Sequence, residues 1–290
     1  MNRNYKKLVI GIIAVLVCFN VLAWLAVFQV NNSHDLKVVF FDVGQGDSIF
    51  IETPKRTQIL IDGGPNSKVL EKLNEQMPFF DRSLDMIILT HPDADHLAGL
   101  VEVLKSYKAD FVAWTGVSSS RPEFQEFLAE INQGNAQKLF LAEGEKIIIG
   151  KDVYFEVLAP LENFQGREVS DFNSSSLVLR MVYGKSTFLF TGDSPQSIEW
   201  QLVDSEKDIS SQVLKVSHHG SDSSTSDIFL QKVDPEIAVI SVGEKNRYGH
   251  PAPETLERLE KYGIKIMRTD QLGDIKITSD GTRLINLISN

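Results

Sequence analysis

Side chains that can bind a metal ion are concentrated in one short stretch of the sequence. The apolar stretch 86–90 is followed, within six positions, by four such side chains: His91, Asp93, Asp95 and His96. Imidazole and carboxylate groups bind zinc and the harder divalent cations in proteins. The alternative is an ordinary acidic turn in which Asp95 caps the following helix, but this explains one residue of the four. The spacing therefore predicts a metal site at the end of a buried strand.

Further carboxylates and imidazoles stand at the ends of other apolar stretches. They are Asp62 at the end of 58–62, Asp193 after 187–191, and the pair His218 and His219 after 212–216. Ligands usually bind at the carboxyl ends of the strands in an open α/β sheet. Strands that each deliver an Asp or a His to one sheet edge would bring these ligands together from distant parts of the chain.

The composition restricts the chemistry of such a site. Cys18 is the only cysteine, so the residues after it form no disulfide among themselves and cannot bind metal through thiolate. A set of imidazoles and carboxylates is harder than a typical zinc pocket, which makes manganese and magnesium alternatives to zinc. The formal net charge of −10 argues against broad non-specific binding of nucleic acid, so contact with a polyanion must be local.

Two kinds of apolar pattern alternate along the chain after residue 36. Strand patterns occur at 37–42, 48–52, 58–62, 86–90, 154–158, 177–182, 187–191, 212–216 and 237–242, and helical patterns at 67–76, 96–106, 123–132, 195–205, 226–232 and 253–262. A strand meander followed by covered strands and intervening helices is typical of a layered α/β architecture. We therefore expect one globular domain whose sheets are packed between helices.

The N-terminal end differs from the rest in composition. The stretch 8–30 is almost wholly apolar, and roughly 20 apolar residues suffice for a helix that crosses a membrane. Arg3, Lys6 and Lys7 precede it without an acidic residue, which predicts that this end stays in the cytoplasm. A cleaved signal peptide is the alternative, but its apolar core is usually only about 7–15 residues long. The predicted organisation is a cytoplasmic basic end (1–7), a transmembrane anchor (8–30), a linker (31–35) and one extracellular domain at the cell membrane (36–290).

As a set, the motifs resemble those of a known group of enzymes. The stretch His91-x-Asp93-x-Asp95-His96 is similar to the His-x-His-x-Asp-His signature of metallo-β-lactamase-fold hydrolases, with Asp93 in place of the second histidine. With 41–47, 61–64, 191–193 and 218–221, it resembles the hydrolase domain of ComEC-type competence (DNA-uptake) proteins over most of 36–288. The resemblance implies an α/β fold, the αββα metallo-β-lactamase sandwich, here preceded by one transmembrane helix. ComEC-type proteins join this domain to a large multi-span channel, so DNA uptake itself is not predicted here.

The resemblance also implies roles for the candidate ligands. The implied metal ligands are His91, Asp93, Asp95, His96, Asp193 and His218. Asp95, His96 and His218 would share one ion and Asp193 would bridge two ions, so Asp95 and Asp193 are the expected catalytic carboxylates. The superfamily's additional histidine is absent from 172–176, so one of the two sites is expected to be weak or empty. The expected cofactor is one or two divalent ions, zinc or manganese, with magnesium as an alternative.

Residues around the metal site are expected to orient ligands or contact substrate. Asp62 would orient a ligating histidine or the water, although a turn residue before two glycines is an equal alternative. His219, His250 and Arg247 would contact substrate, Arg247 and His250 by donating to a phosphate, although a surface loop would give Arg247 the same composition. Asp47, in a Gly-rich turn, would lie on the substrate side of the rim.

These expectations combine into one functional hypothesis. Paired cations activate water near neutral pH and neutralise the charge that develops on a phosphoryl group. We therefore expect a membrane-anchored, extracytoplasmic metal-dependent phosphodiesterase or nuclease, with the membrane contacted through 8–30 and nucleic acid or another phosphodiester as substrate. No protein partner is predicted. The alternatives are a hydrolase of a lactam, thioester or lactone, and a metal-free binding module at the cell surface.

Overall fold

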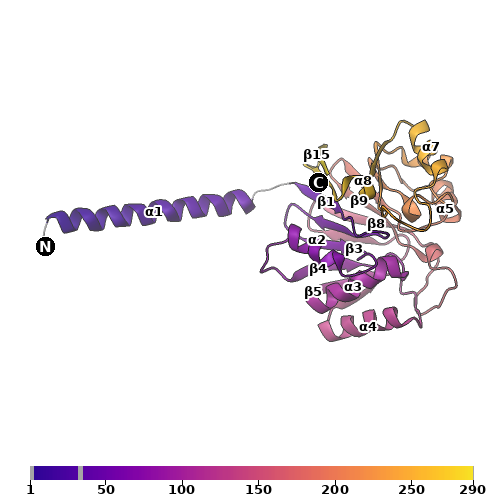
Figure 1. Ribbon diagram of the computed structural model, residues 1–290, viewed down its shortest axis with the longest axis horizontal. Helices are drawn as coiled ribbons and strands as arrows, with labels where there is room; N and C mark the ends of the chain where they lie inside the picture. The colour runs from indigo at the N-terminus through magenta and orange to yellow at the C-terminus, as the bar shows by residue number, and fades with distance from the viewer. Residues whose placement is uncertain (1–2, 32–34, 290) are drawn as a thin grey trace. The chain divides into compact units, whose positions relative to one another are not determined.

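The computed structural model describes residues 3–31 and 35–289. The chain forms two compact units, residues 1–35 and residues 36–290. Within the predicted basic end and the predicted linker, residues 1–2 and 32–34 lie outside the described residues. The first unit contains helix α1 (Arg3–Asn31) (Figure 1). The apolar side chains of Leu16 and Trp24 in this helix are exposed. Among the described residues, no helix combines the length and the apolar character needed to cross a membrane, and the transmembrane prediction for 8–30 finds no support there.

The second unit is built on two β-sheets. The first sheet has the strand order β15 (Leu284–Ser289), β14 (Ile275–Ser279), β1 (Leu36–Phe40), β2 (Ile49–Glu52), β3 (Gln58–Ile61), β4 (Ser83–Ile88), β5 (Lys108–Trp114) and β6 (Gln137–Phe140). It is antiparallel from β15 to β3 and parallel from β3 to β6. The second has the order β13 (Lys265–Arg268), β12 (Ile237–Ile240), β11 (Val213–Lys215), β10 (Ser186–Phe190), β9 (Val178–Tyr183), β8 (Val153–Ala159) and β7 (Lys146–Ile149), with β10 to β13 parallel.

Helices cover the outer faces of both sheets. They are α2 (Lys68–Gln76), α3 (Ala94–Ser106), α4 (Pro122–Gly134), α5 (Gln196–Asp204), α6 (Asp227–Val233) and α7 (Pro253–Lys261). The unit also contains the short helix α8 (Thr269–Leu272) and the 3₁₀ helices η1 (Asn173–Ser175) and η2 (Ser217–Gly220). Figure 1 shows α2, α3 and α4 together on one side of this unit, and α5 and α7 on the other.

The hydrophobic core divides into three layers. One cluster joins the facing sides of the two sheets, a second lies between the first sheet and α2 to α4, and a third lies between the second sheet and α5 to α7. Strand β3 shows the reason, because Ile59 and Ile61 belong to the inter-sheet cluster and Leu60 to the helix side, as the alternation of a strand requires. The predicted αββα sandwich is therefore confirmed.

The parallel strands of both sheets end at one edge of the sandwich. Strands β3 and β4 pair with Ile61 opposite Ile88, so Asp62 and the loop after β4 follow side by side. Strands β10 and β11 pair with Phe190 opposite Lys215, which places the segments that carry Asp193 and the two histidines next to each other. The candidate ligands all follow the carboxyl ends of these four strands.

Candidate metal centre

The loop from β4 to α3 supplies ligands without using them as helix caps. Asp93 is the residue before α3, and its side chain makes no capping hydrogen bond. Asp95 lies inside the first turn of α3, which excludes the alternative that it caps the helix. Both carboxylates are therefore available to the site.

His96 is fixed in one orientation by the carboxylate behind it. Its Nδ1 donates to Asp62 Oδ2 at 2.8 Å, and Asp62 also accepts from the backbone N–H and the hydroxyl of Thr90 at 2.8 and 2.7 Å. Burial alone lowers the pKa of His96, but the charges of Asp193 and Asp62 raise it well above its usual value. With the proton held at Nδ1, Nε2 faces Asp193 Oδ1 at 3.4 Å. The position of Asp62 is thus that of a carboxylate that orients a metal-binding histidine.

His91 presents the same ring nitrogen to the site. The hydroxyl of Thr90 donates to Asp62, so it accepts from His91 Nδ1 at 3.0 Å. Nε2 of His91 then lies 3.6 Å from Asp93 Oδ2 and 4.0 Å from Asp193 Oδ2. Burial, together with the neighbouring His96, lowers the pKa of His91 to about 3, so the ring is neutral at physiological pH and its lone pair is free.

The two adjacent histidines of η2 point in different directions, and His219 lies closer than His218 to the other candidate ligands. Both have left-handed backbone angles, with φ of 49° at His218 and 55° at His219. His219, predicted as a substrate contact, is buried, and its Nε2 lies 3.3 Å from Asp95 Oδ2 and 3.5 Å from Asp193 Oδ2. His218, predicted as a ligand, is 31% exposed and lies 3.9 Å from Asp193 Oδ2. The strained backbone at this pair is itself characteristic of functional sites.

His219 also has a defined tautomer. Its Nδ1 lies 2.9 Å from the carbonyl oxygen of Ser241, which can only accept, so Nδ1 carries a proton. Burial lowers the pKa of His219, but Asp193, Asp47 and Asp95 more than offset this and raise it to about 9. These carboxylates therefore stabilise a positive charge at Nε2, and a metal cation can take the place of the proton there.

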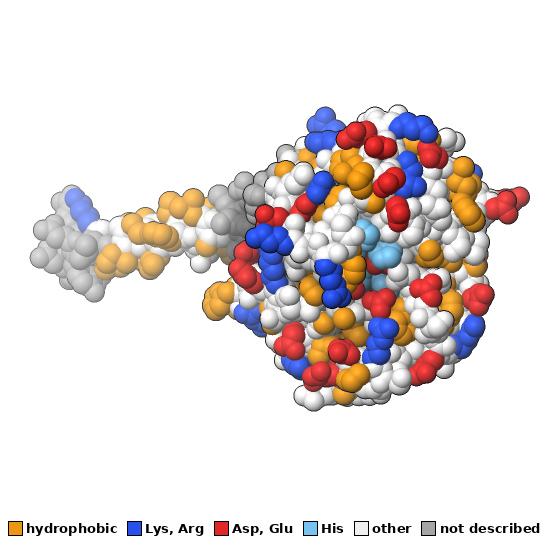
Figure 2. Space-filling view, turned by 45° about the vertical axis from the view of Figure 1, so that its right-hand side comes forward, with side chains coloured by type: hydrophobic (Ala, Val, Ile, Leu, Met, Phe, Trp, Pro, Cys, Tyr) orange, Lys and Arg blue, Asp and Glu red, His pale blue; other side chains and the backbone are white. Residues whose placement is uncertain are grey.

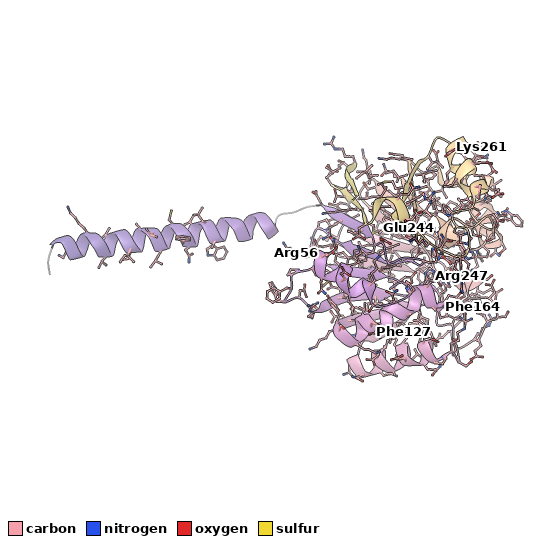
Figure 3. The ribbon with its side chains drawn as sticks, viewed as in Figure 1. Arg56, Phe127, Phe164, Glu244, Arg247 and Lys261 are labelled. Atoms are coloured by element: carbon pink, nitrogen blue, oxygen red, sulfur yellow. The ribbon has the colours of Figure 1, made fainter. Side chains whose placement is uncertain are left out.

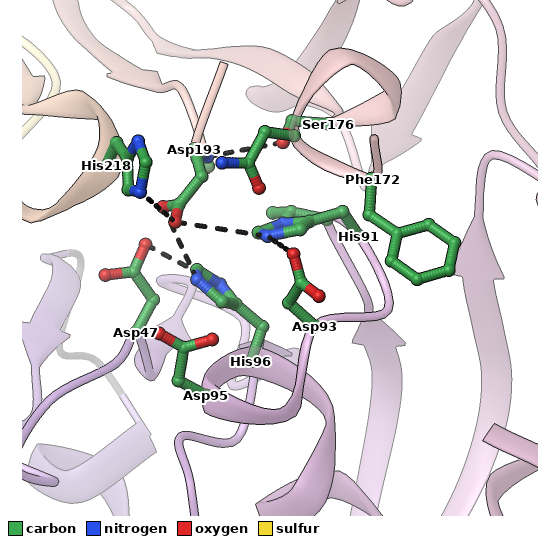
Figure 4. Close-up of polar contacts among 12 residues, drawn as sticks. Asp47, His91, Asp93, Asp95, His96, Phe172, Ser176, Asp193 and His218 are labelled. Carbon is green, nitrogen blue, oxygen red and sulfur yellow. Dashed lines mark hydrogen bonds and ion pairs between the residues drawn. The ribbon is translucent and has the colours of Figure 1, made fainter. Parts of the chain in front are cut away.

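Asp193 lies at the centre of this arrangement. Its backbone N–H donates to Ser176 Oγ at 3.3 Å, which fixes the loop after β10. Burial alone raises the pKa of Asp193, but His219, His96 and His91 hold it well below its usual range. Figure 4 shows this carboxylate between His91, His96 and His218, with Asp93 and Phe172 on one side and Asp47 and Asp95 on the other. Asp193 thus lies within 4.0 Å of all three buried imidazoles.

The buried atoms without partners fit a divalent cation. Nε2 of His91, of His96 and of His219, and Oδ1 of Asp193, are buried and have no hydrogen-bond partner among the described residues. Two sets of ligand atoms each lie within 4.8 Å of one another: His91, His96 and Asp193, and Asp95, His96 and His219. Buried polar atoms are rarely left without partners, so these four atoms fit residues that bind a divalent cation. The structure thus brings together His91, Asp95, His96, Asp193 and His219.

Lys215 and Asp47 form a buried pair behind the metal ligands, and Lys215 was not predicted from the sequence. Lys215, at the end of β11, is fully buried, forms an ion pair with Asp47, and donates to the carbonyl of Gly192 at 3.2 Å. Asp47, predicted on the substrate side of the rim, is 1% exposed and lies behind His219 Nδ1 at 3.4 Å, so that prediction is wrong. The ammonium group neutralises a carboxylate that burial alone would destabilise. The sequence did contain a signal for this pair, because a lysine within an apolar strand stretch needs a buried carboxylate as its partner.

The metal centre opens into a cavity of about 290 Å³. Its walls include Asp93, His218 and His250, so His250 lies where the prediction placed a substrate contact. Arg247, which is labelled in Figure 3, lines an adjoining cavity. Its Nη2 donates to the hydroxyl of Tyr248 at 3.0 Å. Figure 2 shows histidine side chains at the surface near the middle of the domain face, among acidic and basic side chains. The site is therefore accessible from solvent.

Comparison with known proteins identifies the family. Residues 41–244 match the metallo-beta-lactamase superfamily. The chain belongs to this superfamily. It is a metallo-β-lactamase-fold hydrolase, a fold that implies a bound divalent metal, and the buried ligand set described above fits that requirement.

The relatives are competence proteins, which confirms the resemblance predicted from the motifs. ComE operon protein 3 of Bacillus subtilis is 33% identical over 277 residues, which cover 90% of this chain and 35% of the relative. Competence protein ComA of Neisseria gonorrhoeae is 34% identical over 248 residues, 84% of this chain and 32% of the relative. The chain thus spans about a third of the length of these relatives. A solved structure, the metallo hydrolase Igni18 from Ignicoccus hospitalis, shares the fold, with a TM-score of 0.55 at 14% identity over 83% of this chain and 98% of that chain.

Proposed function

We propose that this protein is a divalent-metal-dependent phosphodiesterase that acts on nucleic acid. The observation that carries the proposal is a group of three buried imidazole nitrogens and one carboxylate oxygen that have no hydrogen-bond partner among the described residues, beside an open cavity. The similarity to competence proteins over most of the chain points to nucleic acid as the phosphodiester.

The ligand atoms suit one or two cations of intermediate hardness. Because Nε2 of His96 has a single lone pair, His96 would hold an ion either with His91 and Asp193 or with Asp95 and His219. The mixture of imidazole and carboxylate favours zinc or manganese, with magnesium as an alternative. Such ions supply positive charge that lowers the pKa of water and neutralises charge on phosphoryl oxygens. Asp62 would keep His96 in the ligating tautomer, and Lys215 would keep Asp47 ionised behind His219.

Histidine and arginine side chains around the cavity would contact the phosphate. His250 is partly buried beside His218, with ring centroids 5.6 Å apart, and its Nδ1 has no partner among the described residues. Burial, together with the charges of His218 and His219, lowers the pKa of His250, so its ring is neutral near pH 7. A neutral ring can donate from one nitrogen to a phosphate oxygen or a leaving oxygen, and Arg247 would add a charged donor at the cavity's edge.

The cellular placement is a separate part of the proposal. The apolar stretch 8–30 and the basic residues before it support membrane attachment with the catalytic unit outside the cytoplasm. This placement stays a prediction.

A metal-by-substrate activity screen tests the proposed function. The full chain, stripped with chelator and reloaded with manganese, zinc or magnesium, should hydrolyse bis-p-nitrophenyl phosphate and single-stranded DNA, and chelator should abolish both activities. Asp95→Ala and His96→Ala should each abolish turnover while far-UV circular dichroism stays unchanged. Hydrolysis of a lactam, thioester or lactone without hydrolysis of either phosphodiester would contradict the proposal, as would turnover in either variant equal to that of the unaltered protein.

A further inference from the structure

The cavity over the metal centre continues on both sides. On one side it adjoins a cavity of about 390 Å³ lined by Lys245, Arg247 and Tyr248, and Tyr248 lines both cavities. On the other side it adjoins a cavity of about 270 Å³ lined by Ser119, Arg121 and other residues of two loops, and Arg121 lines both. The metal centre is therefore the middle of a row of three cavities.

Arg121 is held rigidly at one end of this row. Its guanidinium carbon lies 4.6 Å from the centre of the Phe172 ring, and Phe172 is buried. Its Nη1 donates to Asp93 Oδ1 at 2.8 Å, while Asp93 Oδ2 lies 3.6 Å from Nε2 of His91. An arginine already fixed by stacking and by an ion pair loses little further freedom when it binds an anion. Through Asp93, Arg121 links the cavity of about 270 Å³, here called the side cavity, to the metal ligand His91.

The rest of the guanidinium group is available to a ligand. Hydrogen bonds of this group to described residues are formed by Nη1 alone, so Nε and Nη2 retain their donors. The side chain is 53% exposed although it is held from two directions. Glu168 also lines the side cavity, so an anion there would be bound by the guanidinium group and not by the net charge of the walls. Arginine with two free donors matches the geometry of a phosphate group.

The opposite end combines cations with an aromatic ring. Tyr248 is 54% exposed, and its ring is nearly parallel to that of His250, with centroids 5.9 Å apart and an interplanar angle of 14°. The guanidinium carbon of Arg247 lies 5.1 Å from the centre of the Tyr248 ring, and Lys245 lines the same cavity. Exposed aromatic rings beside basic side chains bind the bases and phosphates of single strands.

We propose that the three cavities form one binding cleft for an extended single-stranded polynucleotide, with its scissile phosphate at the metal centre and neighbouring phosphates at Arg121 and at Lys245 and Arg247. This inference rests on the proposed phosphodiesterase function and adds two binding subsites to it. A cleft that continues past the metal centre in both directions does not require a strand end. We therefore expect cleavage of internal bonds. The acidic surface confines contact with the strand to these local cations.

A covalently closed circle of single-stranded DNA tests the mode of cleavage. The full chain loaded with manganese should cut the circle and a linear strand of the same sequence at similar initial rates. An intact circle beside a linear strand shortened from its ends would overturn the inference. Hydrolysis of bis-p-nitrophenyl phosphate without cleavage of either strand would also overturn it, and would leave the phosphodiesterase function standing. Failure to hydrolyse any of the three substrates would refute the proposed function and the inference together.

Arginine variants test the subsite itself. Arg121→Gln should lower kcat/KM for single-stranded DNA by roughly 10–100-fold, as expected for loss of a hydrogen bond to a charged group. It should also reduce the slope of log kcat/KM against log salt by about 0.7, the value for one phosphate contact on a single strand. Arg121→Lys should keep that slope, and it controls for loss of folding. Arg283→Gln, at a side chain 79% exposed and outside the three cavities, should change neither quantity. An unchanged salt slope in Arg121→Gln would refute a phosphate contact.

Discussion

At the scale of single residues, the site is set by which ring nitrogen each histidine leaves free. In His91, His96 and His219 the partner of Nδ1 is different: a hydroxyl, a carboxylate and a backbone carbonyl. The result is the same in each case, because Nε2 is left without a partner among the described residues. Fixed tautomers of this kind are the ordinary way in which proteins prepare imidazoles for metal binding.

The assignment of His219 in place of His218 leads to a prediction on metal affinity. His219→Ala should weaken binding of zinc or manganese by more than the roughly 10–100-fold that loss of an orienting partner costs, because it removes a ligand. His218→Ala is the matched comparison, because this neighbouring imidazole lies at the cavity wall. The metal affinity of His218→Ala should change far less than that of His219→Ala. Competition with a chromophoric chelator measures both. The reverse order of the two affinities would restore the original assignment of His218.

Part of this site could be predicted from the sequence. His91, Asp95, His96 and Asp193 follow strand ends, and strand ends of one sheet edge converge whatever the details of the loops. The choice between His218 and His219 could not be predicted, because it depends on two left-handed backbone angles in η2. The role of Asp47 was mistaken for a similar reason: Lys215, which draws it inward, lies 168 positions away in a different sheet.

At the scale of secondary-structure elements, the start of α3 is fixed by contact between two backbones. The N–H of Gly63 donates to the carbonyl of His96 at 2.7 Å, and the N–H of Gly99 donates to the carbonyl of Gly64 at 2.9 Å. A Cβ on Gly99 would lie 1.9 Å from the carbonyl oxygen of Gly63, so only glycine permits this approach. The helix that carries Asp95 and His96 is thereby held against the loop that carries Asp62.

This contact predicts a loss of stability from a single methyl group. Gly99→Ala should lower the free energy of unfolding by about 1–3 kcal/mol or more, as overpacking of a buried contact does, and should weaken metal binding because α3 must move. Gly134→Ala is the control, since a Cβ there meets nothing within 4 Å and alanine is favoured over glycine in helices by up to about 1 kcal/mol. Urea unfolding measures both changes. Equal stability of the two variants would show that the contact is not tight.

The elements that the sequence predicted are those with a strong apolar period. The expected helices at 67–76, 96–106 and 253–262 correspond to α2, α3 and α7. Six strands were not predicted: β5, β6, β7, β13, β14 and β15. Four of them, β6, β7, β13 and β15, lie at the edges of their sheets, and the residues of β6 and β7 are exposed or only partly buried. Such strands depend on hydrogen bonds to a neighbouring strand, which local sequence does not specify.

At the scale of the whole molecule, the site needs both sheets of the second unit. The first sheet contributes Asp62 and the loop after β4, and the second contributes Asp193 and His219. The inter-sheet core, with residues such as Ile61, Ile88 and Phe190, brings these strand ends together. Neither sheet alone supplies a complete set of ligands, so metal binding depends on the packing of the sandwich.

The most direct test of this account is the metal content of the full chain. After loading with manganese or zinc and exhaustive dialysis, mass spectrometry for metals should find one or two ions per chain, and a variant with both His96→Ala and Asp193→Ala should retain none. Absence of stoichiometric metal in the unaltered protein, or equal retention by the double variant, would contradict the claim that these buried atoms form a metal centre.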